Sequence, residues 1–225
     1  MMVDDGRIRR VTRSKAEARA NYDRLSRRYD ALAGSSEKKL VDAGLRQLQV
    51  REGERVLEIG FGTGRVILTL ARSVGDRGRV YGLDISEGMF RVAENRVAQA
   101  GVAQRVELRV GDAISLPLEA GTLDAIWMGF TLELFDTPEI PIVLAECRRV
   151  LHSGGRLGIV AMSRQGKAGL MLKLYEWAHD RLPRTVDCRP IYAAEAVRRA
   201  GLDVVACTLG SLWGLPVETV LARAR

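Results

Sequence analysis

The stretch LEIGFGTGR, residues 57–65, decides the fold class of this 225-residue chain. Its three glycines, Gly60, Gly62 and Gly64, stand at every second position after an apolar run that begins at Val56. An α/β sheet binds nucleotides where a strand ends in such a turn and a helix begins, because glycine lets the backbone approach the ligand. The stretch therefore predicts a dinucleotide site, another kind of nucleotide site or only a tight turn in an α/β fold.

The glycine spacing departs from the dinucleotide fingerprint GxGxxG. Counting from Gly60, the sixth position is Arg65, and the third glycine falls one residue early, which gives GxGxG. Glu58 stands two residues ahead of the first glycine, where its carboxylate would repel a pyrophosphate and attract an ammonium group. The turn therefore favours a cationic ligand, while an NAD-linked oxidoreductase stays open as an alternative.

Two further acids follow the next two predicted strands. Asp84 ends the second strand, 20 residues past Gly64, where a carboxylate binds ribose hydroxyls in several kinds of nucleotide site. Asp112 follows the third strand, where it can accept a hydrogen bond from an amine such as that of adenine, or cap a turn. Acids at three successive strand ends predict one nucleotide site.

Strand and helix patterns alternate along most of the chain. Strands are predicted over 55–59, 80–83, 106–110, 123–128, 156–161, 204–209 and 217–222. Helices are predicted over 15–32, 37–48, 65–74, 87–100, 138–151 with Thr137 as its cap, 167–182, and a last one ending at Gly201. This alternation predicts a parallel sheet with helices on both faces. The short connection SLWGLP predicts a closing hairpin and a reversed edge strand.

The length and the charge distribution fit one α/β domain with a basic extension. Residues 1–50 are expected to form a basic arm and cap helices, and residues 51–225 the core, with a cap insertion at about 165–188. The net charge is +7, and residues 1–28 hold nine Lys or Arg against four acids, a net of +5. We expect residues 1–13 to be disordered, either as a solubilising arm or as a contact for nucleic acid, lipid or an acidic substrate.

The cysteines and the hydropathy pattern point to the cytoplasm. Cys147, Cys188 and Cys207 are odd in number and form no CxxC pair, so we expect reduced thiols. No apolar stretch approaches the roughly 20 residues of a membrane-spanning helix, and the first ten residues lack a signal-peptide core. The sequence contains no Ser-His-Asp set and no metal-ligand spacing, so no metal is expected.

Four stretches occur in a characteristic order: VLEIGFGTG, VYGLDIS, VGDAISLPLEAGTLDAI and AECRRVLHSGGRLGIV. Together they resemble the class I S-adenosylmethionine-dependent methyltransferases. With YDRLSRRYDAL ahead of the core, the chain is most similar to the ubiquinone/menaquinone-biosynthesis type, over about residues 20–162. The resemblance implies a three-layer Rossmann-like fold, with a seven-stranded mostly parallel sheet in the order 3-2-1-4-5-7-6, strand 7 antiparallel. It also implies S-adenosylmethionine as cofactor and S-adenosylhomocysteine as product.

The resemblance assigns roles around the cofactor. Glu58 would lie near the methionine ammonium, and Asp84 would take the ribose hydroxyls. Asp112 with Ala113 would read the adenine edge, and Met128 would begin the segment that faces the transferred methyl. The full set of expected cofactor contacts is Tyr29, Glu58, Gly60, Phe61, Gly62, Thr63, Gly64, Asp84, Ile85, Met89, Gly111, Asp112, Ala113 and Met128.

Tyr22 and Tyr29 lie seven residues apart on the first predicted helix and share one face. They would either cover the cofactor or pack on the core, and Tyr29 is the preferred cofactor contact. For an acceptor that must lose a proton, His179 and Glu133 are the candidate general bases, whereas His152 is expected at the surface. The apolar stripe within 170–182 predicts an acceptor pocket, a membrane contact or core packing.

The expected function is methyl transfer to a small apolar acceptor, such as a quinone precursor. Positioning alone supplies much of the acceleration, on the order of 7 to 11 kcal/mol, because the sulfonium is already activated. The alternatives are a phospholipid amine head-group N-methyltransferase, an NAD-linked oxidoreductase and a non-catalytic RNA-binding module. The last is least favoured, because no aromatic residues interleave with the basic ones in residues 1–20. Peripheral membrane contact and oligomer formation stay open.

Overall fold

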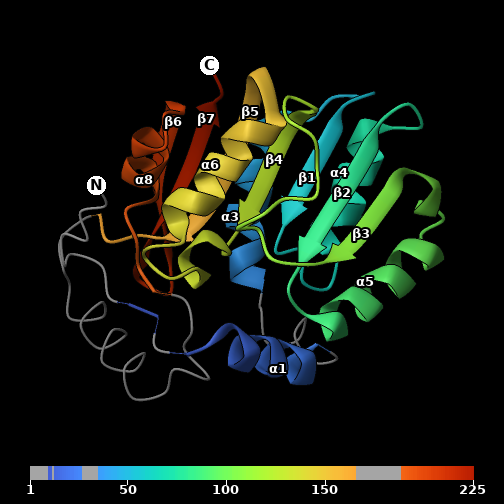
Figure 1. Cartoon of the computed structure of the whole chain (residues 1–225), viewed down its shortest axis with the longest axis horizontal. Helices are drawn as coiled ribbons and strands as arrows, with labels where there is room; N and C mark the ends of the chain where they lie inside the picture. Colours follow the sequence, from blue (N-terminus) through green and yellow to red (C-terminus); the bar gives the residue numbers. More distant parts are fainter. Residues whose placement is uncertain (1–9, 12, 27–34, 166–188) are drawn as a thin grey trace.

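A seven-stranded sheet forms the centre of the computed structural model, which describes residues 10–11, 13–26, 35–165 and 189–225. The strands are β1 Arg55–Ile59, β2 Arg79–Asp84, β3 Val106–Val110, β4 Leu123–Gly129, β5 Leu151–Met162, β6 Asp203–Leu212 and β7 Leu215–Arg223. Their order is β3-β2-β1-β4-β5-β7-β6 (Figure 1), and β7 runs antiparallel to both of its neighbours. The expected order and the reversed seventh strand are confirmed.

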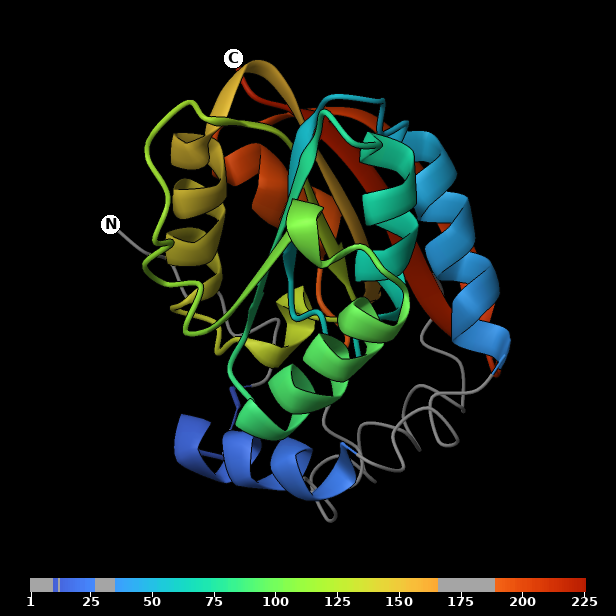
Figure 2. The same ribbon diagram turned by 90° about the vertical axis from the view of Figure 1, so that its right-hand side faces the viewer.

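Helices cover both faces of this sheet. They are α1 Lys15–Leu25, α3 Ser35–Leu48, α4 Arg65–Val74, α5 Glu87–Gln99, α6 Ile140–Val150 and α8 Ala193–Arg199. Figure 2 shows α6 and α8 on one face of the sheet and α3, α4 and α5 on the other. The helix α1 belongs to neither layer, because it lies across the end of the sheet where β1, β2 and β3 terminate (Figure 1).

The buried residues explain this layering. In α4, the residues Ile67, Leu70, Ala71 and Val74 recur at helical spacing and are all buried against the sheet. The strand β4 is buried along nearly its whole length, as expected of a central parallel strand covered on both faces. Gly44 allows α3 to pack closely, since a Cβ there would lie 2.5 Å from the ring of Trp127. Two apolar layers therefore enclose the sheet.

The predicted start of α6 is wrong by two residues. The helix begins at Ile140, with Glu139 as its N-cap residue and Pro141 in its first turn, and Thr137 does not cap it. The carboxylate of Asp136 accepts a hydrogen bond from the Thr137 backbone amide, and that of Glu139 accepts one from the Asp136 amide. These two bonds form a separate turn that delays the helix.

Two expectations about the sheet also need correction. The strand predicted over 156–161 is longer: β5 begins at Leu151, so it includes HSGG, residues 152–155, and it has a register shift opposite Leu123 and Ala125 of β4. The reversed strand is not the edge strand, because β7 lies between β5 and β6. A hairpin can place either of its two strands next to β5, and the sequence does not show which. Here the second strand, β7, lies next to β5, and the first strand, β6, forms the edge.

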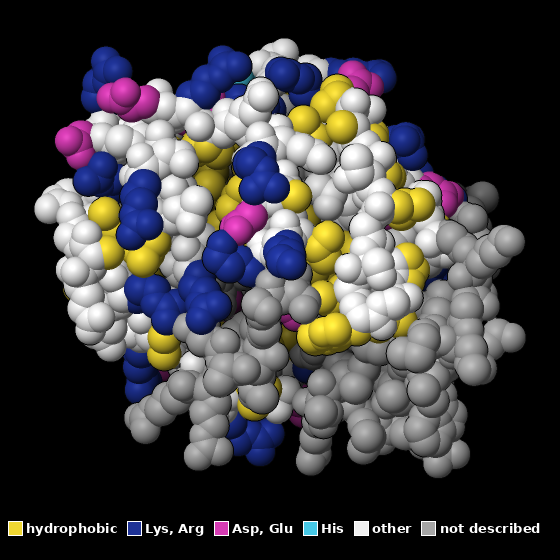
Figure 3. All heavy atoms as spheres, turned by 180° about the vertical axis from the view of Figure 1, so that it is seen from behind, with side chains coloured by type: hydrophobic (Ala, Val, Ile, Leu, Met, Phe, Trp, Pro, Cys, Tyr) yellow, Lys and Arg dark blue, Asp and Glu magenta, His cyan; other side chains and the backbone are white. Residues whose placement is uncertain are grey.

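The surface is charged on the rear face as well as near the N-terminus. Figure 3 shows Lys and Arg side chains spread over the face that α3 and α4 cover, with Asp and Glu among them. Among the described helices, none combines the length and the apolar character needed to cross a membrane.

Candidate cofactor site

A cavity of about 460 Å³ lies between α1 and the carboxyl ends of β1 to β4. Eight of the expected cofactor contacts line it: Gly60, Gly62, Asp84, Ile85, Met89, Gly111, Asp112 and Ala113. All but Met89, which is in the first turn of α5, follow the ends of three adjacent strands, so the parallel sheet brings them together. The cavity is therefore the site to which the sequence motifs point.

The glycine loop between β1 and α4 forms one wall of the cavity. Gly60 has a φ of 74°, and a Cβ there would lie 2.4 Å from the Thr131 hydroxyl oxygen. Gly64 has a φ of 79°, and its Cβ would lie 2.8 Å from that of Ala93. Gly62 has a φ of 51° and would meet no protein atom within 4 Å. Gly60 and Gly64 are therefore required for packing, whereas Gly62 keeps the cavity wall open.

Glu58 lies on β1 just below this loop and is only 4% exposed. Its Oε2 atom is buried and has no hydrogen-bond partner among the described residues. Burial, followed by the negative charge of Asp84, raises the pKa of Glu58 well above its ordinary value of 4.5. An unpartnered carboxyl oxygen at this place fits a ligand that brings a cation or an N–H group.

Asp84 connects the glycine loop to α5. Its Oδ2 accepts a hydrogen bond from the Gly62 amide at 2.8 Å, and its Oδ1 accepts one from the Ser86 amide at 2.9 Å. Burial raises the pKa of Asp84, and these amide hydrogen bonds partly oppose the increase. The carboxylate lines the cavity and is held in one orientation, as a ribose-binding group must be.

Asp112 closes the turn that its sequence context predicts, and its second oxygen contacts an amine of the protein itself. Its Oδ1 accepts a hydrogen bond from the Ile114 amide at 3.1 Å, which closes the turn after β3. Its Oδ2 accepts one from the ammonium of Lys15, which also lies 2.6 Å from Oε1 of Glu139. Oδ1 of Asp112 therefore stabilises the turn, and Oδ2 makes its contact with Lys15 inside the cavity.

The helix α1 is attached to the N-terminus of α5. Asp23 accepts hydrogen bonds from the Ser86 hydroxyl at 2.6 Å and from the Gly88 amide at 2.8 Å. Arg19 forms an ion pair with Glu87 at 2.5 Å. A Cβ at Gly88 would lie 2.8 Å from the Cα of Asp23, so the glycine allows this close approach. These contacts hold α1 over the cavity.

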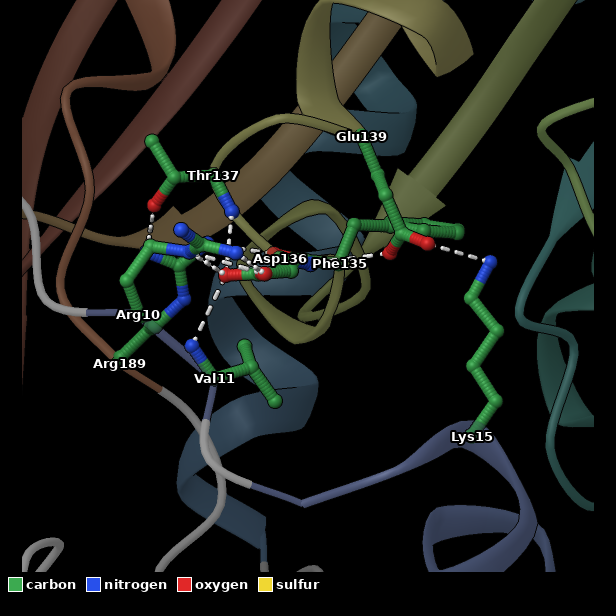
Figure 4. A network of polar contacts seen from close by, with 8 residues as sticks. All are labelled: Arg10, Val11, Lys15, Phe135, Asp136, Thr137, Glu139 and Arg189. Atoms are coloured by element: carbon green, nitrogen blue, oxygen red, sulfur yellow. Dashed lines mark hydrogen bonds and ion pairs between the residues drawn. The ribbon is translucent and has the colours of Figure 1, made fainter. Parts of the chain in front are cut away.

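A polar network closes the other side of the cavity (Figure 4). Arg10 donates to both carboxylate oxygens of Asp136, and the Val11 amide donates to the same group at 3.0 Å. Arg189 donates to the Thr137 hydroxyl at 3.0 Å and to a neighbouring backbone carbonyl. The Arg10 hydrogen bond lowers the pKa of Asp136 to about 2. The expected disorder of residues 1–13 is therefore wrong for Arg10 and Val11.

Several expected site residues lie elsewhere. Phe61 and Met128 are buried, Thr63 and Gly64 face α5, and none of the four lines the cavity. Glu58 does not line it either, because its side chain is buried below the glycine loop. Glu133 is fully buried, and its Oε1 accepts a hydrogen bond from the Met162 amide at 3.0 Å. Since Glu133 does not line the cavity, the structure favours a structural role over that of a general base. Tyr29 and His179 lie outside the described residues.

The cavity also contains residues that the motifs did not identify. From α1 and the segment before it come Arg13 and Lys15, and from the region after β4 come Phe130, Thr131, Leu134, Phe135, Asp136 and Glu139. Tyr22 lines the cavity as well, which agrees with one of its two predicted positions. The seven-residue spacing of Tyr22 and Tyr29 was the sequence signal that α1 could cover the cofactor, although Tyr29 was the preferred contact. Phe130 has a φ of 52°, a strained backbone conformation for an aromatic residue that the sequence does not reveal.

Within the described ranges, no group of three or more His, Cys, Asp or Glu side chains is arranged to hold a metal ion.

His152 lies at the surface at the opposite end of the sheet, where its Nε2 is 3.1 Å from Oδ1 of Asp124.

Comparison with known proteins agrees with this site. Residues 56–155 match the family described as a methyltransferase domain. The chain is 33% identical to the demethylmenaquinone methyltransferase of Bacillus subtilis over 155 residues, which cover 69% of this chain and 64% of that protein. It is 37% identical to the 2-phytyl-1,4-naphtoquinone methyltransferase of Synechococcus elongatus over 114 residues, which cover 51% of this chain and 48% of that protein.

Among solved structures, a SAM-dependent methyltransferase from Aquifex aeolicus has the same fold, with a TM-score of 0.66 and 23% identity over 89% of this chain and 98% of that one. The matched residues and the fold agree on one class: residues 56–155 match the methyltransferase-domain family, and the chain has the fold of a SAM-dependent methyltransferase. Within that class the chain is similar to quinone methyltransferases, and it spans 64% of the length of the Bacillus subtilis relative.

Proposed function

We propose that the chain transfers a methyl group from S-adenosylmethionine to a small apolar acceptor of the quinone-precursor class. The observation that carries the proposal is the convergence of the glycine loop, Asp84 and Asp112 on one cavity, with the unpartnered Oε2 of Glu58 below the loop. A ligand with a cationic amine, a ribose and an adenine presents the groups that these three acids would bind.

In this proposal each part of the cofactor has its own residues. Glu58 orients the loop toward the methionine ammonium, and Asp84 accepts hydrogen bonds from the ribose hydroxyls. Asp112 accepts one from the adenine amine, and Met89 packs against the ring. When bound, the cofactor supplies an activated methyl group, so the chain has to position the acceptor in line and exclude water.

The acceptor side of the cavity is apolar with a charged rim. Phe130, Leu134 and Phe135 line it, and Asp136 and Glu139 stand at its edge. An aromatic ring with polar substituents matches this combination. The two relatives named above carry quinone acceptors in their names, which supports the same chemical class. A phospholipid amine head group is the alternative acceptor, because the rim acids would also attract a cation.

A transfer experiment tests the proposal. The purified protein is incubated with methyl-labelled S-adenosylmethionine and either a demethylated naphthoquinol, phosphatidylethanolamine vesicles or a polar metabolite extract. We expect label in the naphthoquinol, and much less label with the Asp84→Ala variant at the same cofactor concentration. Label only in the phospholipid would establish the alternative, and label in neither apolar acceptor would contradict the proposal.

Four broader features belong to the proposal. Residues 1–50 act as a basic cap on a core of residues 51–225, which the contact between Arg10 and Asp136 supports. A cytoplasmic location is favoured by the unpaired thiols of Cys147 and Cys207. Peripheral membrane contact would give the cavity access to an apolar acceptor. Dimer formation is also part of the proposal, and sedimentation tests it.

A further inference from the structure

The ammonium of Lys15 occupies the part of the cavity assigned above to adenine. It is hydrogen-bonded to Oδ2 of Asp112 and lies 2.6 Å from Oε1 of Glu139. All three residues line the cavity, and their side chains remain partly exposed, at 39%, 28% and 26%. A cation of the protein itself therefore sits between two carboxylates of the binding site.

The position of Lys15 is fixed by its helix. Lys15 is the first residue of α1, directly after Ser14, which forms a capping box with Glu17. Asp23 at the other end of α1 is bound to Ser86 and Gly88. Figure 4 shows the Lys15 side chain extending from α1 toward Glu139. The ammonium is thus directed into the cavity by a capped helix whose other end is attached to α5.

The ammonium is also held in its charged form. Partial burial lowers the pKa of Lys15, but the hydrogen bonds to Asp112 and Glu139 outweigh this effect and leave it above 10.5. Because Oδ1 of Asp112 serves the Ile114 amide, Oδ2 is the oxygen on which Lys15 and an incoming amine would compete.

We propose that Lys15 is a built-in competitor of the cofactor, which leaves Asp112 and stays with Glu139 when an adenine amine binds. This inference rests on the proposed function, because it takes Asp112 as the adenine-reading residue. Glu139 then has a defined purpose: it keeps the displaced ammonium paired, so that the exchange costs little. The competition weakens the binding of cofactor and product alike and speeds release of the product.

The test compares binding of S-adenosylhomocysteine to wild type, Lys15→Met and Lys15→Arg by isothermal titration calorimetry. This ligand has no net charge, so the loss of a cation does not by itself change its attraction to the cavity. We expect Lys15→Met to bind it two- to fivefold more tightly, on the order expected for a partly exposed ion pair, and Lys15→Arg to bind like wild type. Lys38→Met, which breaks the Lys38–Asp42 pair on the outer helix α3, is the matched control and should change nothing.

Two further measurements separate competition for Asp112 from a general effect of the Lys15 substitution on ligand affinity. S-inosylhomocysteine has an oxygen in place of the adenine amine, so its affinity should not improve in Lys15→Met. Glu139→Gln removes the residue that receives the displaced ammonium, so it should weaken S-adenosylhomocysteine binding. In the double variant, Glu139→Gln should have no effect, because no ammonium remains.

The outcomes are distinct. Unchanged or weaker S-adenosylhomocysteine binding in Lys15→Met would overturn the proposal, as would equal improvement with the inosine analogue. Should Lys15→Met fail to fold, Glu139→Gln tests the same idea with Lys15 in place, and unchanged affinity there would also overturn it. Failure of wild type to bind S-adenosylhomocysteine at all would contradict the proposed function instead.

Discussion

Glu58 on β1 and Asp84 at the end of β2 are two acids close enough for the charge of Asp84 to raise the pKa of Glu58. Both lie beneath or beside the glycine loop, which Asp84 holds through the Gly62 amide. Two neighbouring acids with little solvent are unfavourable in the empty protein, and a cationic ligand relieves that repulsion. In the proposed function, this pair would attract the ammonium of the cofactor.

The first prediction concerns the pH dependence of cofactor binding. Because the pKa of Glu58 is raised, part of the free protein holds a proton there at pH values above 4.5. A ligand ammonium favours the ionised form, so binding releases that proton, and affinity rises with pH through the raised pKa and then levels off. Titration calorimetry in buffers of different ionisation enthalpy measures the proton release. Glu58→Gln should bind more weakly and release no proton; equal release by this variant would contradict the assignment.

The second prediction concerns Asp84. Asp84→Ala removes hydrogen bonds to a charged group, each worth about 1.5 to 3 kcal/mol, so we expect S-adenosylhomocysteine affinity to fall by roughly tenfold to 100-fold or more. Fluorescence or calorimetric titration measures the loss. His152→Ala, at the opposite end of the sheet, should bind normally. Near-wild-type affinity in Asp84→Ala would refute the ribose contact.

The third prediction separates the roles of two glycines. Gly60→Ala should lose more stability than Gly62→Ala, because its Cβ would collide with Thr131 at 2.4 Å, whereas a Cβ at Gly62 meets nothing within 4 Å. Both positions have positive φ, which costs about 1 to 2 kcal/mol for a residue other than glycine. Urea unfolding gives the two stabilities. Gly62→Ala should stay folded yet bind cofactor more weakly, since its methyl group enters the cavity; equal stability losses would contradict this distinction.

The fourth prediction concerns His152 and stability. Its Nδ1 hydrogen bond to the Ser153 carbonyl, and its contact with Asp124, raise the pKa of His152 above 6.5. A raised folded-state pKa means that the stabilisation is fully present below pH 6.5 and disappears as the pH rises through the raised value. The difference in melting temperature between wild type and His152→Gln should therefore shrink as the pH rises above 6.5. A constant difference across that range would show that the charge of His152 does not contribute.

Much of the fold followed from local signals in the sequence. The strand, the glycine turn and the helix around Gly60 each depend on neighbouring residues, and Ser86 caps α5 as its position predicts. The start of α6 was misplaced because Asp136 and Glu139 form a competing turn, which depends on the exact direction of their side chains.

The cavity-lining residues that the sheet brings together could be predicted from the sequence. Those contributed by segments far apart in the chain could not. Asp84 and Asp112 end adjacent parallel strands, so their proximity follows from strand order. Lys15 reaches Asp112 across 97 positions of sequence through the placement of α1, and no local pattern indicates this contact. The strained backbone of Phe130 is likewise imposed by its surroundings, since its amide is bound to the carbonyl of Val160.

The central claim is that the cavity between α1 and the sheet binds S-adenosylmethionine. Isothermal titration of the purified protein with S-adenosylhomocysteine and, separately, with NADH tests it most directly. We expect one molecule of S-adenosylhomocysteine to bind per chain, more weakly in Asp84→Ala by the factor given above, and no binding of NADH. Binding of NADH without binding of S-adenosylhomocysteine would contradict it.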